Sequence, residues 1–304
     1  MKKSLLVLGL AVAAFTSCSN DEVLDINKNT NIGFDAFVNK GTRAVTSTTT
    51  GNLKKFYVFG NHGTAVDFSN VAVTLNGTSW DCATNVPWTA SNYYFAAYAT
   101  TNTSEQITPA YADGALTFSD IVANDASDLV AATASVNNTA MGNATVGLTF
   151  KHLLSKVSFA ITNSSSDYKL TVSDLTFNVL KQGDCVFSNA AAATWTPEGT
   201  ASALSFAGGN AAKSATFSSE DHLVIPNQAL TEVKASFTVT FFNDADEKVY
   251  EKPYSNVSLA LTSGLWLPGY SYVYTASVSP ATENIQFSVV QVDEWTSATP
   301  GMTL

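Results

Sequence analysis

Arginine is nearly absent from this sequence. Arg43 is the only arginine among 304 residues, and the other basic residues are lysines. After Arg43 the chain carries ten lysines against twenty-one aspartates and glutamates, a net charge of −11. Because nucleic-acid binding depends on clustered lysine and arginine side chains that neutralise phosphates, this balance excludes nucleic acid as a partner. Only 13% of the residues are charged, which is typical of a secreted β-rich protein rather than of a cytosolic enzyme.

Cysteine and histidine are also scarce, with three of each. None of them lies in a CxxC pair, an HExxH motif or a GxSxG turn, so the sequence offers no zinc site, redox pair or activated nucleophile. We expect no enzyme activity, no bound metal and no cofactor, and we expect His152 to be structural. Cys82 and Cys185 are far apart in the chain, and the sequence leaves open whether they form a disulfide.

Long apolar runs are absent except near the N-terminus. Lys2 and Lys3 precede the apolar stretch Leu5–Phe15. That stretch has the length of a signal peptide and is too short for a permanent membrane span, which needs about 20 apolar residues. We therefore predict that residues 1–17 are removed on export.

The apolar stretch ends in Phe-Thr-Ser-Cys, which resembles the lipobox of bacterial lipoproteins. This resemblance predicts that Cys18 becomes the lipidated first residue, whereas an ordinary secretory signal would make the cysteine incidental. Acyl chains on Cys18 would hold the protein to the outer membrane. Asp21 and Glu22 follow at once and resemble a surface-export signal, so we expect a surface-exposed protein.

Alternation of apolar and polar residues is abundant, and helical periodicity is nearly absent. Strand-like segments recur along the chain, and the one helix-like candidate is Ser119–Ala134. Two-faced strands of this kind are typical of antiparallel sandwiches. We predict an all-β fold with little helix and two mainly antiparallel β-sandwich domains, residues 44–145 and 146–304. The loop 135–144 marks the expected junction.

The first alternating strand lies just before Arg43. Its apolar face is expected to consist of Ile32, Phe34, Ala36 and Val38. The stretch that follows, "NKGTRAVTSTTTGN", is rich in glycine, serine and threonine, as exposed segments that proteases cut often are. A cut after the one arginine of the sequence would fall in this segment and leave the rest of the chain whole. The alternative is that arginine is merely rare and falls in this loop by chance.

Five tryptophans support an alternative function. Exposed tryptophans on a β-sandwich can stack on sugar rings, which would make the protein a surface glycan-binding lipoprotein. Large aromatic side chains more often belong to cores or interfaces. The tryptophans are Trp80, Trp88, Trp195, Trp266 and Trp295.

Several motifs, in this order, resemble the fimbrillin family, the subunits of type V pili. After the signal that ends at Cys18 come the strand "IGFDAFV" and the segment "KGTRA", which holds Arg43. Further on, "LTFKHLLSKVSFAIT" opens the second expected domain. "LPGYSYVYTASV" and the last strand, "NIQFSVVQVDEW", follow near the C-terminus. The similarity extends over nearly the whole chain.

This resemblance implies a fold and a maturation route. The domains would be transthyretin-like Greek-key sandwiches. The precursor would be exported as a lipoprotein and cut by an arginine-specific protease between Arg43 and Ala44, which would free the propeptide 18–43. Loss of its strand would leave a groove that a donor strand from another pilus subunit fills. Donor residues are expected within 284–298, at Ile285, Phe287, Val289, Val292 and Trp295.

The end of the chain departs from this pattern. Little sequence follows Trp295, and the apolar face changes between Val289 and Val290. The last strand is thus open to a second interpretation, as an integral strand of a permanently lipid-anchored tip or anchor subunit. The sequence does not distinguish stalk, tip and anchor subunits. It also does not identify a host or bacterial surface ligand.

Overall fold

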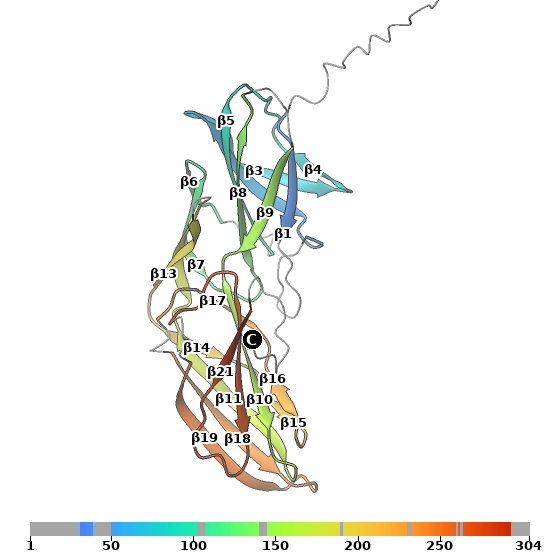
Figure 1. Cartoon of the computed structure of the whole chain (residues 1–304), viewed down its shortest axis with the longest axis vertical. Coiled ribbons are helices and arrows are strands. Elements are labelled where there is room, and N and C mark those ends of the chain that lie inside the picture. The colour runs from blue at the N-terminus through green and yellow to red at the C-terminus, as the bar shows by residue number, and fades with distance from the viewer. Residues whose placement is uncertain are drawn as a thin grey trace, which may run out of the picture. The chain divides into compact units, whose positions relative to one another are not determined.

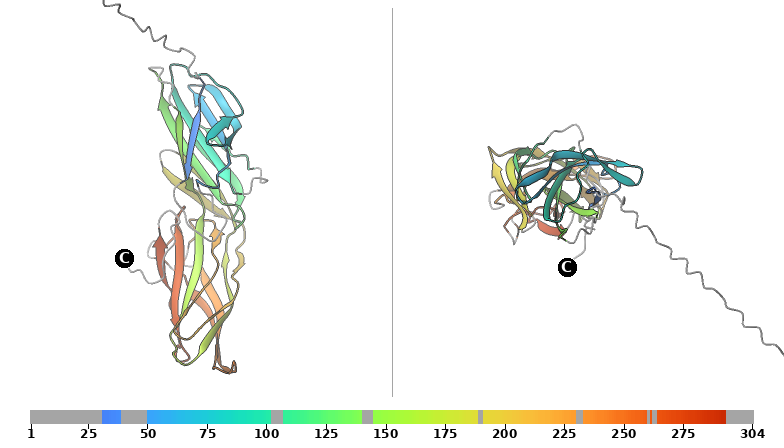
Figure 2. Two further views of the ribbon diagram at one scale, coloured as in Figure 1. Left: turned by 90° about the vertical axis from the view of Figure 1, so that its right-hand side faces the viewer. Right: turned by 90° about the horizontal axis from the view of Figure 1, so that it is seen from above.

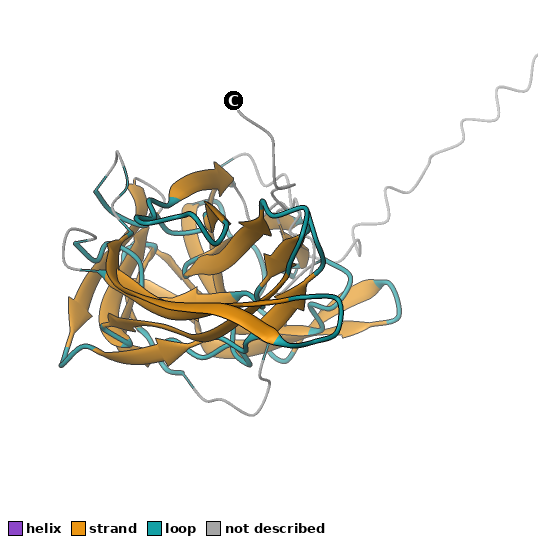
Figure 3. Cartoon of the chain, turned by 90° about the horizontal axis from the view of Figure 1, so that it is seen from below, coloured by secondary structure: helices purple, strands orange, loops and turns teal. Residues whose placement is uncertain are grey.

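The computed structural model describes residues 31–38, 50–101, 107–139, 145–188, 191–229, 233–259, 261 and 264–292. These residues form strands and connecting turns, and none of them is helical (Figure 3). Accordingly, this part of the chain contains no helix that could cross a membrane. The predicted all-β class is confirmed, whereas the transthyretin-like assignment stays a prediction.

A seven-stranded sheet contains the first described strand (Figure 1). Only its β1–β9 pair is parallel. The two ends of the sheet approach each other, because Asn31 bridges to Pro87 shortly after β4. The sheet is therefore nearly closed. In spatial order its strands are β1 (Phe34–Val38), β9 (Val146–His152), β8 (Leu129–Asn137), β5 (Asn92–Thr100), β2 (Lys55–His62), β3 (Ala65–Asn76) and β4 (Ser79–Cys82).

Three further sheets complete the described chain. One runs β13 (Ala191–Glu198), β12 (Gln182–Ser188), β7 (Ala115–Val122) and β6 (Ala110–Ala112). The second runs β16 (Thr216–Ser218), β10 (Ser155–Asn163), β20 (Ser271–Val278) and β21 (Ser288–Val292), with β17 (His222–Val224) also on β10. The third runs β14 (Ser202–Ser205), β11 (Lys169–Val179), β18 (Lys234–Phe242) and β19 (Lys248–Ser258), with β15 (Gly209–Ala211) also on β11.

Buried side chains form three clusters. One fills the seven-stranded sheet and another lies between the two sheets that contain β10 and β11. The third joins the outer side of the seven-stranded sheet to the four-stranded sheet, with Tyr98 and Phe118 from the first half of the chain and Trp195 from the second. The two halves of the sequence therefore share one apolar cluster.

Strand pairing crosses the junction that we expected near residue 145. Strand β9, which we assigned to the second domain, pairs with β8 and β1 in the first sheet. Strand β12 pairs with β7 from the first half. Alternation identified both strands but could not indicate these distant partners, since it is a local pattern. The division into two independently folding domains stays a prediction.

The helix-like interpretation of Ser119–Ala134 is wrong. The segment consists of the end of β7, a turn and the start of β8. Asp120 has a φ of 58°, a left-handed conformation that no right-handed helix contains. In the turn, the Asn124 side chain accepts a hydrogen bond from the Ala126 amide at 2.9 Å, which favours a turn over a helix.

Two aspartates of this turn connect it to other strands. Asp128 contacts the buried His152 of β9, with 2.9 Å between Oδ2 and Nδ1. Asp125 accepts a hydrogen bond from the Leu223 amide at 2.7 Å, and its second oxygen contacts the His222 ring. Burial alone would lower the pKa of His222, but Asp125 and Glu220 outweigh burial and raise the pKa above 6.5.

The raised pKa of His222 predicts a pH-dependent stability. Protonated His222 stabilises the fold, so this contribution is complete below pH 6.5 and is lost as the pH rises through the folded-state pKa. We expect the unfolding free energy of the wild type to fall over this range relative to that of His222→Gln and Asp125→Asn. Urea unfolding between pH 5.5 and 8.5 measures the difference. A pH-independent difference would contradict the prediction.

Candidate functional site

Strand β1 fills one edge of the nearly closed sheet, beside β9 (Figure 2). Its residues alternate strictly between the core and the solvent, as the period of a strand requires. The outward residue Phe37 is 56% exposed. The inward residues are Ile32, two positions before the strand, and Phe34, Ala36 and Val38 within it, with exposed fractions of 3%, 3%, 6% and 4%. The structure thus brings together in the core all four residues that the alternation placed on one face.

Phe34 occupies an aromatic pocket, which we define by the rings of Phe56, Phe68 and Phe95. The ring centroids of these residues lie 6.3, 5.4 and 5.7 Å from that of Phe34. All three contacts are edge-to-face, the arrangement that aromatic quadrupoles favour. The pocket is therefore shaped for a flat ring, and sequence reasoning did not detect it because its walls come from three separate strands.

Hydrogen bonds hold both ends of β1. At its start, the Ile32 amide donates to the Val86 carbonyl at 2.7 Å. At its end, the Thr50 hydroxyl accepts from the Val38 amide at 2.9 Å and donates to the Val38 carbonyl at 3.0 Å. Val38 and Thr50 flank the segment that contains Arg43, so the two described ends of that connection meet.

Four predicted site residues lie outside the described part of the chain. These are Cys18, Arg43, Ala44 and Trp295. Lipidation and cleavage therefore stay predictions.

The predicted donor segment lies on its own core. Strand β21 pairs antiparallel with β20 and ends at Val292. Ile285, Phe287 and Val289 pack on the core between the two sheets but are only half-buried. Phe287 is the largest of them, with its ring 5.3 Å from that of Phe159.

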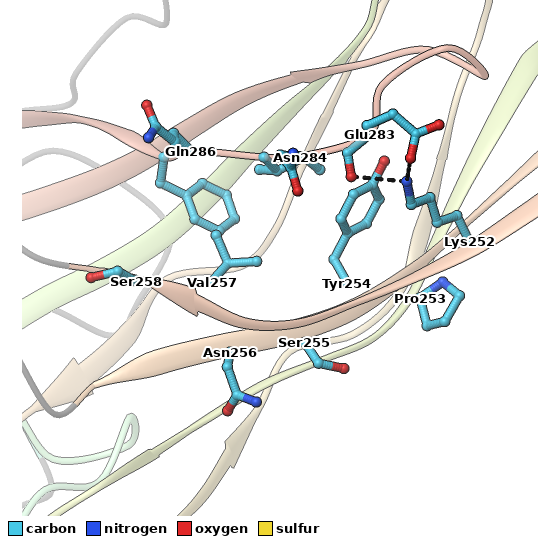
Figure 4. Close-up of a pocket in the computed structure, with 12 residues that line it drawn as sticks. Lys252, Pro253, Tyr254, Ser255, Asn256, Val257, Ser258, Glu283, Asn284 and Gln286 are labelled. Atoms are coloured by element: carbon cyan, nitrogen blue, oxygen red, sulfur yellow. Dashed lines mark hydrogen bonds and ion pairs between the residues drawn. The ribbon is translucent and has the colours of Figure 1, made fainter.

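An open cavity separates the segment 283–287 from β19 (Figure 4). Its volume is about 590 Å³, and strand residues 252–258 form its other wall. Lys252 and Tyr254 bridge one end of the cavity. The Lys252 ammonium donates to the Glu283 carboxylate at 2.9 Å and to the Glu283 carbonyl at 2.8 Å. The Tyr254 hydroxyl donates to the Thr282 carbonyl at 2.8 Å.

This arrangement, which we call the clamp, consists of Lys252, Tyr254, Thr282 and Glu283. The hydrogen bond that Lys252 donates to Glu283 raises the pKa of Lys252, although partial desolvation opposes the shift. Backbone pairing of the segment begins only at Ser288. The clamp therefore attaches the segment to β19 just before its strand pairing with β20 begins.

The described tryptophans do not form an exposed sugar-stacking surface. Trp88, Trp195 and Trp266 are buried. Trp80 is half-buried and packs on Phe56, with ring centroids 5.0 Å apart. The glycan-binding interpretation therefore finds no stacking platform among these four residues.

The remaining candidate groups serve the fold. Each histidine contacts an aspartate, in the pairs His62–Asp67, His152–Asp128 and His222–Asp125. Both thiols are free, and burial raises the pKa of the Cys185 thiol to about 12, so it is unreactive.

A cluster of acidic side chains formed by Asp120, Asp184 and Glu198 lies where β7, β12 and β13 meet. Its ligand oxygens lie within 4.8 Å of one another. Two of the carboxylates already accept hydrogen bonds, Asp184 from the Asp120 amide at 2.9 Å and Asp120 from Gln182 at 2.7 Å. We assign no metal to this surface group.

Replacing Phe34 tests how firmly β1 is held. We expect Phe34→Ala to lower the unfolding free energy of the uncleaved protein by about 3–5 kcal/mol, because it empties the aromatic pocket. Phe37→Ala removes the same side chain from the exposed face of the same strand and should change it by no more than about 0.5 kcal/mol. Urea unfolding measures both values. Equal effects would show that the pocket does not hold the strand.

Replacing Lys252 tests the clamp. We expect Lys252→Met to speed hydrogen exchange at the β21 amides, because the ammonium contacts to Glu283 are lost while the apolar stem remains. Lys248→Met is the matched control, since Lys248 is on the same strand and forms its ion pair with the exposed Glu251, away from the segment 283–287. Mass spectrometry of peptides from 283–292 gives the rates. Unchanged exchange in Lys252→Met would rule out a holding role.

Comparison with known proteins is consistent with this architecture. A fimbrial protein from Bacteroides vulgatus has a similar structure, with a TM-score of 0.61 and 16% identity over 88% of this chain and 99% of that chain. A candidate cell adhesion protein from Bacteroides uniformis gives a TM-score of 0.50 and 20% identity over 88% and 99%. Likeness at such identities shows the fold alone.

The sequence comparisons give the family. A search of curated proteins found no match. The model of the family described as fimbrillin-like matches residues 42–295, which is most of the sequence. The chain therefore belongs to the fimbrillin-like family.

Proposed function

We propose that the protein is the precursor of a structural, non-enzymatic subunit of a cell-surface type V pilus that supports adhesion. It is exported to the outer membrane as a lipoprotein on Cys18, cut after Arg43 and polymerised by strand exchange. The observation that carries the proposal is the position of β1, an edge strand with a fully apolar inner face. The only arginine follows this strand within a few residues.

Removal of β1 exposes part of the apolar core and leaves the edge of β9 unpaired. Each large apolar side chain that leaves the core gives up about 1.5–3 kcal/mol of burial, and three such side chains leave with Ile32, Phe34 and Val38. The backbone of β9 also loses its parallel partner. A subunit without β1 therefore binds an incoming strand that restores both the buried apolar side chains and the backbone hydrogen bonds to β9.

The C-terminal segment 284–298 is the proposed donor. Its apolar residues Ile285, Phe287 and Val289 repeat the alternation of β1, and they are only half-buried on the core of their own subunit. In its described part, which ends at Val292, backbone pairing attaches the segment to β20 alone. The partners are other pilus subunits, with an arginine-specific protease acting before assembly.

A second candidate function is a permanently lipid-anchored tip or anchor subunit. The observation that favours it is the pairing of β21 with β20, which makes the last strand part of the subunit's own sheet. Such a subunit keeps Cys18 and accepts or caps a pilus without donating its C-terminus.

Intact mass and N-terminal sequencing of protein from the cell surface distinguish the two functions. The stalk model predicts an N-terminus at Ala44 and protease-dependent multimers. We expect Arg43→Ala and Arg43→Lys to stay full-length and monomeric, because an arginine-specific protease accepts neither side chain. Acylated Cys18 in all wild-type material would refute the stalk model and favour the anchored subunit.

A further inference from the structure

Two four-residue stretches of the chain differ at one position only. Asn31-Ile32-Gly33-Phe34 leads into β1, and Asn284-Ile285-Gln286-Phe287 leads into β21. We propose that the C-terminal segment of a second copy of this chain enters the β1 groove in a single register, with Phe287 in the aromatic pocket of Phe34. This inference rests on the strand exchange proposed above and adds which side chain fills which position.

The aromatic pocket determines the register. Its three rings face the edge or face of Phe34 at centroid distances of 5.4 to 6.3 Å, so a smaller side chain would leave a cavity. Phe287 is the only phenylalanine in 284–298. Trp295 is the other aromatic residue of the segment, but seating it there would place Asp293 at the buried position of Ile32.

In the proposed register the neighbours of Phe287 also fit. Ile285 takes the position of Ile32 with the same side chain. Val289 takes that of Ala36, opposite Leu148 of β9. The first two inward positions are therefore filled by identical residues and the third by another small apolar one. Gln291 falls at the position of Val38, the last residue of β1, so the match covers the first three inward positions.

Registers displaced by two residues keep the same face inward but bury the wrong groups. A shift in one direction moves Phe287 to the Ala36 position and brings Glu283 to the Ile32 position. A shift in the other direction brings Gln291 to the Ala36 position and the charged Asp293 to the Val38 position, and it leaves Val289 in the aromatic pocket. Unpaired polar and charged groups are costly to bury, and a phenylalanine in place of an alanine overpacks the core. A shift by one residue turns Phe287 outward.

The transfer also improves the burial of the donor side chains. Ile285 and Phe287 are half-buried on their own core, beside the open cavity of Figure 4. Ile32 and Phe34 are each only 3% exposed in the groove. Isoleucine and phenylalanine side chains are thus more deeply buried in the β1 groove of a second copy than on the core of their own subunit. This difference favours exchange once β1 has left.

Engineered cysteine pairs test the register in the full chain. Asp35 lies opposite Gly147 and Phe37 opposite Thr149 on the outer face, so the proposed register places Ser288 opposite Gly147 and Val290 opposite Thr149. The in-register pairs are Gly147→Cys with Ser288→Cys and Thr149→Cys with Val290→Cys. The shifted control is Thr149→Cys with Ser288→Cys. A side chain at Gly147 meets no atom within 4 Å, and Cys82→Ser removes the half-exposed native thiol.

After cleavage and mild oxidation, we expect both in-register pairs to give disulfide-linked ladders on non-reducing gels. The shifted pair should give roughly tenfold less, because disulfides require closely placed Cα atoms. A ladder from the shifted pair alone would overturn the register but leave strand exchange standing. Multimers without any ladder would show that this segment is not the donor in this register. Cleavage without multimers would overturn both the register and the proposed assembly.

Discussion

The parallel pairing of β1 with β9 is the contact on which the rest of the molecule depends. It seats Phe34 among three aromatic rings and nearly closes the first sheet. That sheet in turn supports the third apolar cluster, which joins the two halves of the chain. A strand of five residues therefore completes a core to which distant parts of the sequence contribute.

The two ends of the chain are held in contrasting ways. At the N-terminal end, β1 has hydrogen bonds at both ends and a fully buried inner face. Toward the C-terminus, the last described segment, 283–292, has the half-buried residues Ile285, Phe287 and Val289, strand pairing with β20 and a polar clamp at Lys252. This difference fits the proposed strand exchange, in which β1 would leave only after the chain is cut and the last segment would detach more easily.

Local patterns predicted the all-β class and the inward face of β1, because strand periodicity can be read from neighbouring residues alone. They could not indicate that β9 joins the first sheet, or that Phe56, Phe68 and Phe95 converge on Phe34, since these contacts join distant segments. The clamp at Lys252 was missed for the same reason. The helix-like pattern near Asp120 failed because a left-handed residue leaves no periodic signal.

The distance along the chain between β1 and its partner also affects the order of folding. Phe34 pairs with Val146, more than a hundred residues later, so closing this contact requires a long loop and is expected to come late. Strand β1 is nevertheless the first described strand of the chain, so it is synthesised long before β9. The apolar strand β1 thus stays unpaired until β9 has formed. Because β1 is covalently attached to the same chain, its local concentration near β9 is higher than that of a strand from another chain. If the proposed cleavage occurs, the segment that it removes would also have kept other strands out of this groove while the chain folded.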